Sequence, residues 1–308
     1  MEHIPVLFAE VLEQLAIKPS GVYLDCTFGR GGHSRGILSR LGPEGQLWAL
    51  DRDPEAIISD NARELKKDAR FKLKQARFSA LENIVEGLGL AGQIDGVLID
   101  LGVSSPQFDN PVRGFSFLHE GPLDMRMDSD IGMSAAQWLA GVDEKELIKV
   151  LFDYGEERFA RRIARAIVEK RAQTPIATTR QLAELIAEAV PVKEKHKHPA
   201  TRSFQAIRIE INKELDELNN VLQQSARLLK TQGRLVVISF HSLEDRMVKR
   251  FIRNEAGAKY HPGKLPVKEA DVIKGVFKKS AKAIKPGQLE IKQNPRARSA
   301  VMRVAEKI

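Results

Sequence analysis

Asp25, Asp51 and Asp100 each directly follow a short apolar run of the chain. The first of them opens the segment 25–33, Asp-Cys-Thr-Phe-Gly-Arg-Gly-Gly-His, which holds three glycines. A strand, a glycine-rich turn and the start of a helix, in this order, are the parts of a nucleotide-cofactor site. A carboxylate at the end of the next strand can accept hydrogen bonds from both hydroxyls of a ribose. These residues therefore predict a site for a nucleotide-containing cofactor at the ends of neighbouring strands.

The glycines of this turn allow a ligand to approach the backbone closely. Glycine has no side chain, so the amides around Gly31, Gly32 and His33 can form the surface on which the ligand lies. The dehydrogenase pattern Gly-x-Gly-x-x-Gly is not met, because Ser34 stands where the third glycine is required. The spacing instead resembles the first motif of class I S-adenosylmethionine methyltransferases, with Thr27 where a glycine is often found. An ordinary tight turn between a strand and a helix is the alternative.

Four side chains are predicted to contact the same cofactor. Asp51 is expected to bind the ribose, while Asp25 is expected near the methionine end of the cofactor. Phe78 follows the third apolar strand and can wall the adenine ring, and Asp100 can reach the cofactor's amino group or orient the substrate. Three of them have a structural alternative: Asp51 as an N-cap or turn residue, Phe78 as a core aromatic, and Asp100 as a turn residue.

The tetrapeptide Ser105-Pro106-Gln107-Phe108 follows Asp100 closely. It resembles the (Asp/Asn/Ser)-Pro-Pro-(Tyr/Phe/Trp) motif of amino-methyltransferases, with Gln107 in place of the second proline. The exocyclic amine of a base is a poor nucleophile because its lone pair is delocalised into the ring. An oxygen acceptor at Ser105 and a nearby backbone carbonyl can localise that lone pair, and Phe108 can stack on the base, worth on the order of 1–3 kcal/mol. Ser105 and Phe108 are therefore the candidate catalytic residues; a Ser-Pro loop with a buried phenylalanine is the alternative.

The elements that must position these residues alternate along the first hundred residues. Apolar runs predict strands, and segments with helical spacing between them predict helices, so we expect a mostly parallel sheet with helices on both faces. The expected strands are 22–26, 46–51, 71–75 and 95–100, and the expected helices are 33–40, 53–67 and 79–87.

The alternation stops after Phe108 and resumes about ninety residues later. A loop at 109–133 and helices at 144–152, 156–171 and 179–188 lead to the polar run 193–199. The sequence therefore predicts a discontinuous domain, 1–108 with 201–308, and an inserted helical substrate-recognition subdomain, 109–200. The resumed domain is expected to hold a long helix at 203–230 that stops at Gly233, a strand at 234–240, a helix at 243–254, a basic connection at 261–286 and a last strand at 300–305.

The composition is that of a globular protein, with 43% hydrophobic and 29% charged residues in 308. One cysteine excludes an internal disulfide and a multi-cysteine zinc cluster, and no apolar run approaches the roughly 18 residues of a membrane span. These features, with no secretion signal at the N-terminus, favour a cytoplasmic protein that binds no membrane and no metal ion. The segment 246–308 has 17 basic and 5 acidic residues, which predicts a footprint for nucleic-acid phosphates, with a solubilising tail as the alternative.

Other residues have a chemical and a structural interpretation. Cys26 is expected to be a buried structural thiol, and His196 with His198 a solvated loop pair, because no third metal ligand accompanies them. His241 is either a site residue at the sheet edge or part of a helix cap. The run 124–128, Asp-Met-Arg-Met-Asp, either shapes the mouth of the substrate site or forms a self-paired turn.

The whole chain resembles the bacterial family of 16S ribosomal RNA cytosine-N4 methyltransferases, the RsmH or MraW type. Several of the matching blocks are long and unusual. They are 3–7, 25–33, 51–54, 100–107, 113–117, 121–128, 204–209 and 240–246.

The resemblance implies the fold, the donor and the acceptor. It implies a class I methyltransferase domain, Rossmann-like and interrupted by a helical substrate-recognition insertion, with S-adenosylmethionine as the methyl donor. The acceptor would be a cytidine in the decoding region of 16S ribosomal RNA, in the small ribosomal subunit. A homodimer is one of the oligomeric states left open. The resemblance gives Gln107 a cofactor role, and its cofactor contacts correspond to Gly31, Gly32, His33, Asp51, Phe78, Asp100 and Gln107.

Two other functions are weighed against this one. A nicotinamide-dependent dehydrogenase is disfavoured by Ser34 and by the tetrapeptide at 105–108. A non-catalytic ribosome-assembly factor that binds RNA through the basic segment 246–308 would need neither the glycine turn nor the three strand-end aspartates.

Overall fold

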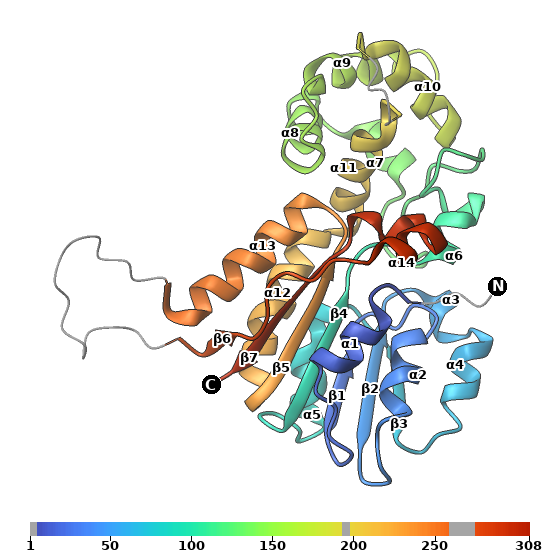
Figure 1. The fold of residues 1–308 in the computed structure, drawn as a ribbon. Coiled ribbons are helices and arrows are strands. Elements are labelled where there is room, and N and C mark those ends of the chain that lie inside the picture. The colour runs from blue at the N-terminus through green and yellow to red at the C-terminus, as the bar shows by residue number, and fades with distance from the viewer. Residues whose placement is uncertain (1–4, 193–197, 259–274) are drawn as a thin grey trace, which may run out of the picture. The chain divides into compact units, whose positions relative to one another are not determined.

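The computed structural model describes residues 5–192, 198–258 and 275–308 (Figure 1). It divides into two compact units, Met1–Gly102 with Asp216–Ile308, and Val103–Leu215. We call these the sheet unit and the helical unit. The predicted insertion at 109–200 falls within the helical unit. Among the described residues, no helix combines the length and the apolar character that crossing a membrane requires.

The sheet unit is built on seven strands in the order β3-β2-β1-β4-β5-β7-β6. The five strands from β3 to β5 run parallel, whereas β7 pairs antiparallel with β5 and β6 pairs antiparallel with β7. In Figure 1 the blue strands of the first third and the orange and red strands of the last third share this sheet. The strands are β1 (Val22–Asp25), β2 (Gln46–Asp51), β3 (Phe71–Gln75), β4 (Ile94–Asp100), β5 (Leu229–Ser239), β6 (Phe277–Lys279) and β7 (Val301–Lys307).

Alternate residues of the central strands face two separate apolar cores. Leu98 and Val236 face the core that includes helices α1, α2 and α4, whereas Val97 and Val237 face the core that includes α5, α12 and α13. This two-sided burial confirms the predicted mostly parallel, Rossmann-like α/β fold. The helices of the unit are α1 (Phe8–Gln14), α2 (Gly32–Leu38), α3 (Pro54–Ile57), α4 (Asp60–Leu65), η1 (Phe78–Ala80), α5 (Leu81–Gly87), α12 (Glu214–Leu228, which starts at the end of the helical unit), α13 (Ser242–Arg253), η3 (Asn254–Ala258), α14 (Gln288–Gln293) and η5 (Pro295–Ser299).

The strand register brings the three candidate aspartates to one edge of the sheet. Asp25 is the last residue of β1, Asp51 of β2 and Asp100 of β4. These strands are parallel neighbours, so their carboxyl ends meet where open α/β sheets bind ligands. The fold thereby places the residues named by the sequence along one rim.

The helical unit has its own apolar core. Five helices contribute to it, together with the loop that carries Phe115, Leu123 and Met125. The helices of the unit are α6 (Ser105–Asp109), η2 (Pro111–Arg113), α7 (Ala135–Gly141), α8 (Glu144–Gly155), α9 (Ala160–Arg171), α10 (Thr179–Ala189) and α11 (Ala200–Asn212). The polar run 193–199, which was expected to end the insertion, lies mostly outside the described residues. Only His198 and Pro199 of this run are described.

Two predicted helices are each broken in two. The expected helix at 53–67 ends at Ile57 and restarts at Asp60, because the Ser59 hydroxyl accepts a hydrogen bond from the backbone N–H of Ala62 and caps a new helix. The expected helix at 203–230 breaks at Lys213, whose φ of 51° is left-handed. Gly233 does not end that second helix, because α12 stops at Leu228 and β5 already includes Gly233.

Candidate active site

The Asp25 carboxylate holds the two ends of the glycine loop by hydrogen bonds. It is 1% exposed, and its two oxygens accept hydrogen bonds from the Ser34 hydroxyl at 2.6 Å and from the Thr27 backbone N–H at 3.1 Å. Burial raises the pKa of Asp25 above its usual 3.8, while the bond from Ser34 opposes that rise. Asp25 therefore ties the end of β1 to the first turn of α2, and its oxygens are occupied within the protein.

The backbone at Gly31 accommodates only glycine. Its φ is 75°, and an added Cβ would lie 2.7 Å from the Phe28 ring and 2.8 Å from a Leu65 methyl carbon. At Gly32 an added Cβ would lie 2.3 Å from the Pro5 ring. The loop is thus held close to its neighbours with its backbone bare of side chains, as a loop that approaches a ligand must be.

Two hydrogen bonds connect the loop to the neighbouring strand ends. The Gly29 N–H donates to Asp51 Oδ2 at 2.7 Å, and the Asp100 N–H donates to the Thr27 hydroxyl at 2.7 Å. The glycine turn, the end of β2 and the end of β4 therefore form one hydrogen-bonded network. Thr27 and Ser34 were not predicted as members of the site, although a hydroxyl residue inside a glycine turn is the signal that could have indicated them.

Asp51 is a second carboxylate at this rim whose pKa is raised by burial. Its other oxygen, Oδ1, accepts from the Asp53 N–H at 2.9 Å, which makes it a turn acceptor as well as a candidate ligand. Burial raises the pKa of Asp51 from 3.8 to about 6, and the bonds from Asp53 and Gly29 limit the rise. A carboxylate that is desolvated and fixed by two backbone amides keeps lone pairs for hydroxyl donors.

His33 and Asp100 face one another with hydrogen-bonding capacity to spare. His33 is 5% exposed, its Nε2 lies 3.6 Å from Asp100 Oδ2, and neither ring nitrogen makes a hydrogen bond in the described structure. Asp100 Oδ1 is also buried without a hydrogen bond there. Buried polar atoms left in this state are costly, so they indicate a polar ligand at this place. The site therefore fits a cofactor that brings both donors and acceptors.

Phe78 begins the short helix η1, and two residues, the second of them the extended Arg77, separate it from the end of β3. Its ring is half-buried and packs against the core that contains Leu50 and Leu81. The next residue, Ser79, donates from both its N–H and its hydroxyl to Glu217, at 3.1 and 2.9 Å, which fixes the turn. Phe78 thus has the packing of a core aromatic and keeps an exposed part, and its adenine-wall role stays a prediction.

Ser105, Gln107 and Phe108 lie on the short helix α6 in the helical unit, so the alternative interpretation as a Ser-Pro loop is wrong in its secondary structure. Ser104 caps this helix: Gln107 Oε1 accepts from the Ser104 N–H at 2.8 Å, and the Gln107 N–H donates to the Ser104 hydroxyl at 3.5 Å. Gln107 is 6% exposed, and Phe108 is partly buried against the helical core. Glutamine in place of the second proline therefore has a capping role, which proline could not fill.

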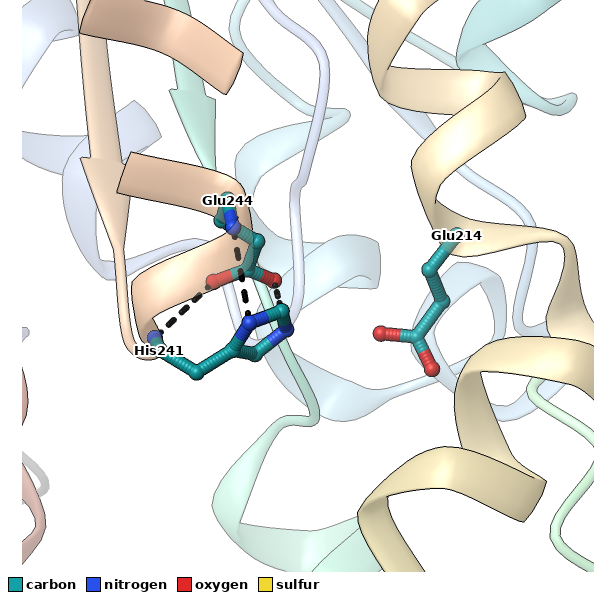
Figure 2. Close-up of side chains that lie close together, drawn as sticks. All are labelled: Glu214, His241 and Glu244. Carbon is teal, nitrogen blue, oxygen red and sulfur yellow. Dashed lines mark hydrogen bonds and ion pairs between the residues drawn. The ribbon is translucent and has the colours of Figure 1, made fainter. Parts of the chain in front are cut away.

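His241 is a capping residue. It precedes α13, its Nδ1 accepts from the Glu244 N–H at 3.4 Å, and Glu244 Oε2 accepts from the N–H groups of His241 and Phe240 at 3.2 and 2.8 Å (Figure 2). Of its two predicted alternatives, the structure supports the cap. Cys26, at 2% exposed with its pKa raised well above 9 by burial, is the buried inert thiol that was predicted. His196 lies outside the described residues.

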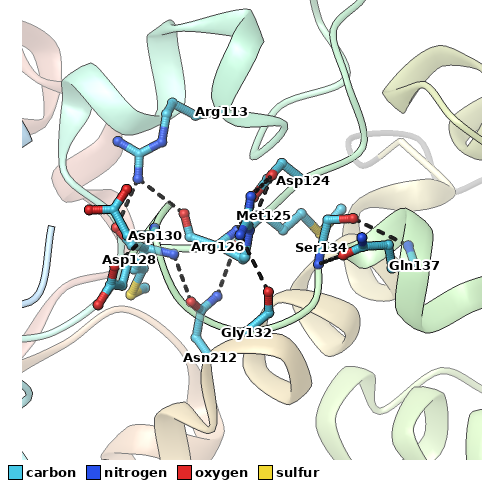
Figure 3. Close-up of polar contacts among 11 residues, drawn as sticks. Arg113, Asp124, Met125, Arg126, Asp128, Asp130, Gly132, Ser134, Gln137 and Asn212 are labelled. Carbon is cyan, nitrogen blue, oxygen red and sulfur yellow. Dashed lines mark hydrogen bonds and ion pairs between the residues drawn. The ribbon is translucent and has the colours of Figure 1, made fainter. Parts of the chain in front are cut away.

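The run 124–128 forms a self-paired turn, one of its two predicted alternatives. Arg126 binds both carboxylate oxygens of Asp124, at 2.7 and 2.9 Å, and Met125 adopts a left-handed φ of 63° (Figure 3). Asn212 clamps the turn by donating to the Met125 carbonyl at 2.7 Å and accepting from the Met127 N–H at 2.8 Å. Arg113 donates to the carbonyls of Arg126 and Met127 at 3.0 and 2.9 Å. All of these contacts come from residues of the helical unit, and together they fix the conformation of the turn.

Comparison with known proteins gives full-length matches. The model of the MraW methylase family matches residues 1–308. The chain is 59% identical over 307 residues to ribosomal RNA small subunit methyltransferase H of Thioalkalivibrio sulfidiphilus, covering 99% of this chain and 97% of that protein. It is 56% identical to the protein of the same name from Methylococcus capsulatus, with 98% and 99% covered, and 55% identical to that of Pseudoalteromonas atlantica, with 99% and 98% covered.

Proposed function

Because the chain belongs to the MraW methylase family, we propose that it methylates the exocyclic N4 amine of a cytidine in the decoding region of 16S ribosomal RNA. It is an S-adenosylmethionine-dependent ribosomal RNA methyltransferase, and its sheet unit has the class I methyltransferase fold. The observation that carries the proposal is the network at the sheet rim, in which the Gly29 N–H donates to the Asp51 carboxylate and the Asp100 N–H donates to the Thr27 hydroxyl. That network, bare of side chains at Gly31, suits an adenosine-containing donor.

Each residue of the rim has a task in holding the donor. Asp51 accepts hydrogen bonds from the ribose hydroxyls, and the backbone of Gly31, Gly32 and His33 lies along the donor. The ring nitrogens of His33 and the Oδ1 atom of Asp100, which make no hydrogen bond in the described structure, bind polar groups of the donor. Phe78 walls the adenine ring, and Gln107 completes the set of contacts. Bound S-adenosylmethionine supplies an electrophilic methyl group on a positively charged sulfur.

Ser105 and Phe108 prepare the acceptor base. The Ser105 hydroxyl and a neighbouring carbonyl accept hydrogen bonds from the N4 amine, which localises its lone pair on nitrogen. Phe108 stacks on the cytosine ring and limits its rotation. Stacking of a base on an aromatic side chain contributes on the order of 1–3 kcal/mol to the free energy of binding. The amine becomes acidic only as it is methylated, so positioning rather than a strong base supplies most of the rate.

The experiment is transfer of tritium from methyl-labelled S-adenosylmethionine to small-subunit ribosomal RNA, followed by mass spectrometry of the nucleosides. Wild-type protein is expected to yield N4-methylcytidine. Ser105→Ala is expected to slow single-turnover transfer while the donor Kd stays unchanged, whereas Asp51→Ala weakens donor binding. Modified cytidine that persists in cells carrying Asp51→Ala with Gly31→Ala would show that this chain is not the catalyst and would favour an assembly factor.

The substrate we propose is the small ribosomal subunit, in the cytoplasm. Assembled subunits and protein-free 16S RNA are compared as acceptors under equal conditions, and faster labelling of the subunit is the expected result. Sedimentation of the enzyme alone then decides between a monomer and a homodimer.

A further inference from the structure

The helical unit contains a recess that neither the donor site nor the tetrapeptide uses. It is a shallow surface recess that lies where α9 begins and where the chain enters α11. Arg158, Phe159, His198 and Arg202 contribute cationic and aromatic groups to its wall, and Val190 and Val192 contribute apolar surface. All of these described residues belong to the helical unit.

The groups of the recess are already arranged by contacts among themselves. The Arg158 guanidinium lies over the Phe159 ring, 4.8 Å from its centroid. The His198 ring stacks against Phe117 with centroids 4.7 Å apart, and its Nδ1 accepts from the Ala200 N–H at 3.2 Å. The neutral imidazole therefore carries its proton on Nε2, which is a donor. These contacts hold an arginine and a histidine donor at the wall with little freedom left to lose on binding.

Positive charge continues from the recess along α9. The segment 158–171 has six basic residues and one acidic residue. Arg161 and Arg162 are exposed in the first turn of α9, a turn with no acidic residue. Cations at the amino end of a helix are unfavourable for the helix itself, because that end already carries partial positive charge. An anionic ligand would relieve this repulsion.

Glu157 determines where an anion can lie. Its side chain is 3% exposed, and its Oε1 accepts from the Phe159 N–H at 2.9 Å, so a carboxylate forms part of the inner wall. A phosphate at the inner wall would meet that carboxylate, whereas a phosphate at the rim meets Arg158 and the first turn of α9.

We propose that the rim of this recess binds two successive phosphates of the substrate RNA, one at Arg158 and one at Arg162, which is one helical turn further along the chain. The proposal rests on the proposed function for the identity of the ligand. The sequence predicts substrate recognition in the insertion and phosphate contacts in the segment 246–308, whereas the phosphate contacts that we propose lie on named residues of the helical unit. Arg158 and Arg162 are the principal cations of this rim, because Arg165 on the same helix is already paired with Glu169 at 2.8 Å.

The test measures binding of full-length protein to 16S ribosomal RNA by filter retention between about 50 and 200 mM KCl. Each phosphate contact contributes about 0.7 to 0.9 to the slope of log affinity against log salt. Arg158→Gln with Arg162→Gln is expected to lower that slope by about 1.4 to 1.8. The ratio of wild-type to variant RNA affinity is then expected to fall about 7- to 12-fold between about 50 and 200 mM KCl. Donor affinity by calorimetry is expected to stay unchanged.

The matched control is Arg63→Gln with Arg165→Gln. It removes the same charge from exposed arginines that are each ion-paired, with Asp60 and Glu169. Equal slopes for the control and the test variant overturn the proposal. Lysine at 158 and 162 is expected to restore the slope, and if the double glutamine variant does not fold, Arg162→Gln alone is expected to lower it by about 0.7 to 0.9.

The two proposals fail in different ways. A wild-type protein that binds RNA with a steep salt dependence but leaves cytidine unmodified overturns the proposed function and leaves this site standing. A methylating enzyme whose test and control variants bind RNA alike overturns this site and leaves the proposed function standing.

Discussion

Replacement of Asp51 by asparagine should remove a pH dependence from donor binding. The pKa of Asp51 is raised from 3.8 to about 6 by burial, so ionised Asp51 at neutral pH costs the folded protein about 3 kcal/mol relative to the unfolded chain. The folded state holds this proton more tightly. The contribution of Asp51 to the free energy of unfolding is therefore largest below about pH 4. It falls by about 3 kcal/mol as the pH rises above 6.

Donor binding has the opposite dependence, because hydroxyl donors require the ionised carboxylate. At pH 5, one unit below the pKa, about nine in ten Asp51 side chains are protonated, and the donor affinity of wild type should be about tenfold lower than at pH 7.5. Asp51→Asn should bind the donor about 10- to 150-fold more weakly at pH 7.5, the worth of one hydrogen bond to a charged group. Its affinity should then change little between pH 7.5 and pH 5.

The assay is titration calorimetry with S-adenosylmethionine at pH 7.5, 6 and 5, beside a thermal melt of each protein. The melt is needed because the amide of the variant can accept from only one of the N–H groups of Gly29 and Asp53. Asp25 also has a raised pKa, so the difference between wild type and variant isolates Asp51. An asparagine variant that keeps the wild-type pH dependence would refute the assignment.

Three further outcomes follow from single contacts. Gly31→Ala should destabilise the protein by at least about 1–2 kcal/mol, because its φ of 75° is left-handed and the new Cβ would lie 2.7 Å from the Phe28 ring; an unchanged melt would contradict this. Asn212→Ala should cost about 2–4 kcal/mol by urea unfolding, since it removes three hydrogen bonds, two of them to the 124–128 turn. Asn212→Asp should be no more stable, because its carboxylate cannot donate to the carbonyls of Met125 and Arg208; a variant as stable as wild type would contradict this. Thr27→Val should weaken donor binding by leaving the Asp100 N–H unpaired, whereas Thr27→Ser should bind as wild type; equal losses would refute the role of the hydroxyl.

The central strands and the site rim could be predicted because both depend on local signals. The buried strands β1, β2, β4 and β5 contain continuous apolar runs, and a polar residue after such a run marks its carboxyl end. Asp51 and Asp100 could therefore be assigned to the sheet rim from their positions in the chain. The direction of the last strand could not, since pairing of β7 antiparallel to β5 depends on contacts distant in the chain.

The helix breaks and the caps were harder to predict because their signals are weak or absent. Lys213 adopts a left-handed conformation that sequence associates with glycine, so nothing local marks the end of α11. β6 is a three-residue strand within a lysine-rich segment, and it forms only because β7 offers an edge. For Gln107 the local pattern Ser-x-x-Gln was present, and a search for capping boxes would have indicated α6.

The pairing of β4 with β5 has a consequence for synthesis of the chain. Asp100 and Ile238 are register partners, yet 137 residues separate them. A ribosome that has released only the first half of the chain leaves the edge of β4, whose first six residues become fully buried, without its neighbour. Residues 103–215 form a compact unit of their own, so this unit can fold once residue 215 has emerged, before β5 is available. During synthesis the helical unit can therefore be folded while the sheet unit is still incomplete. The exposed edge of β4 makes the nascent chain prone to aggregation until β5 has been translated.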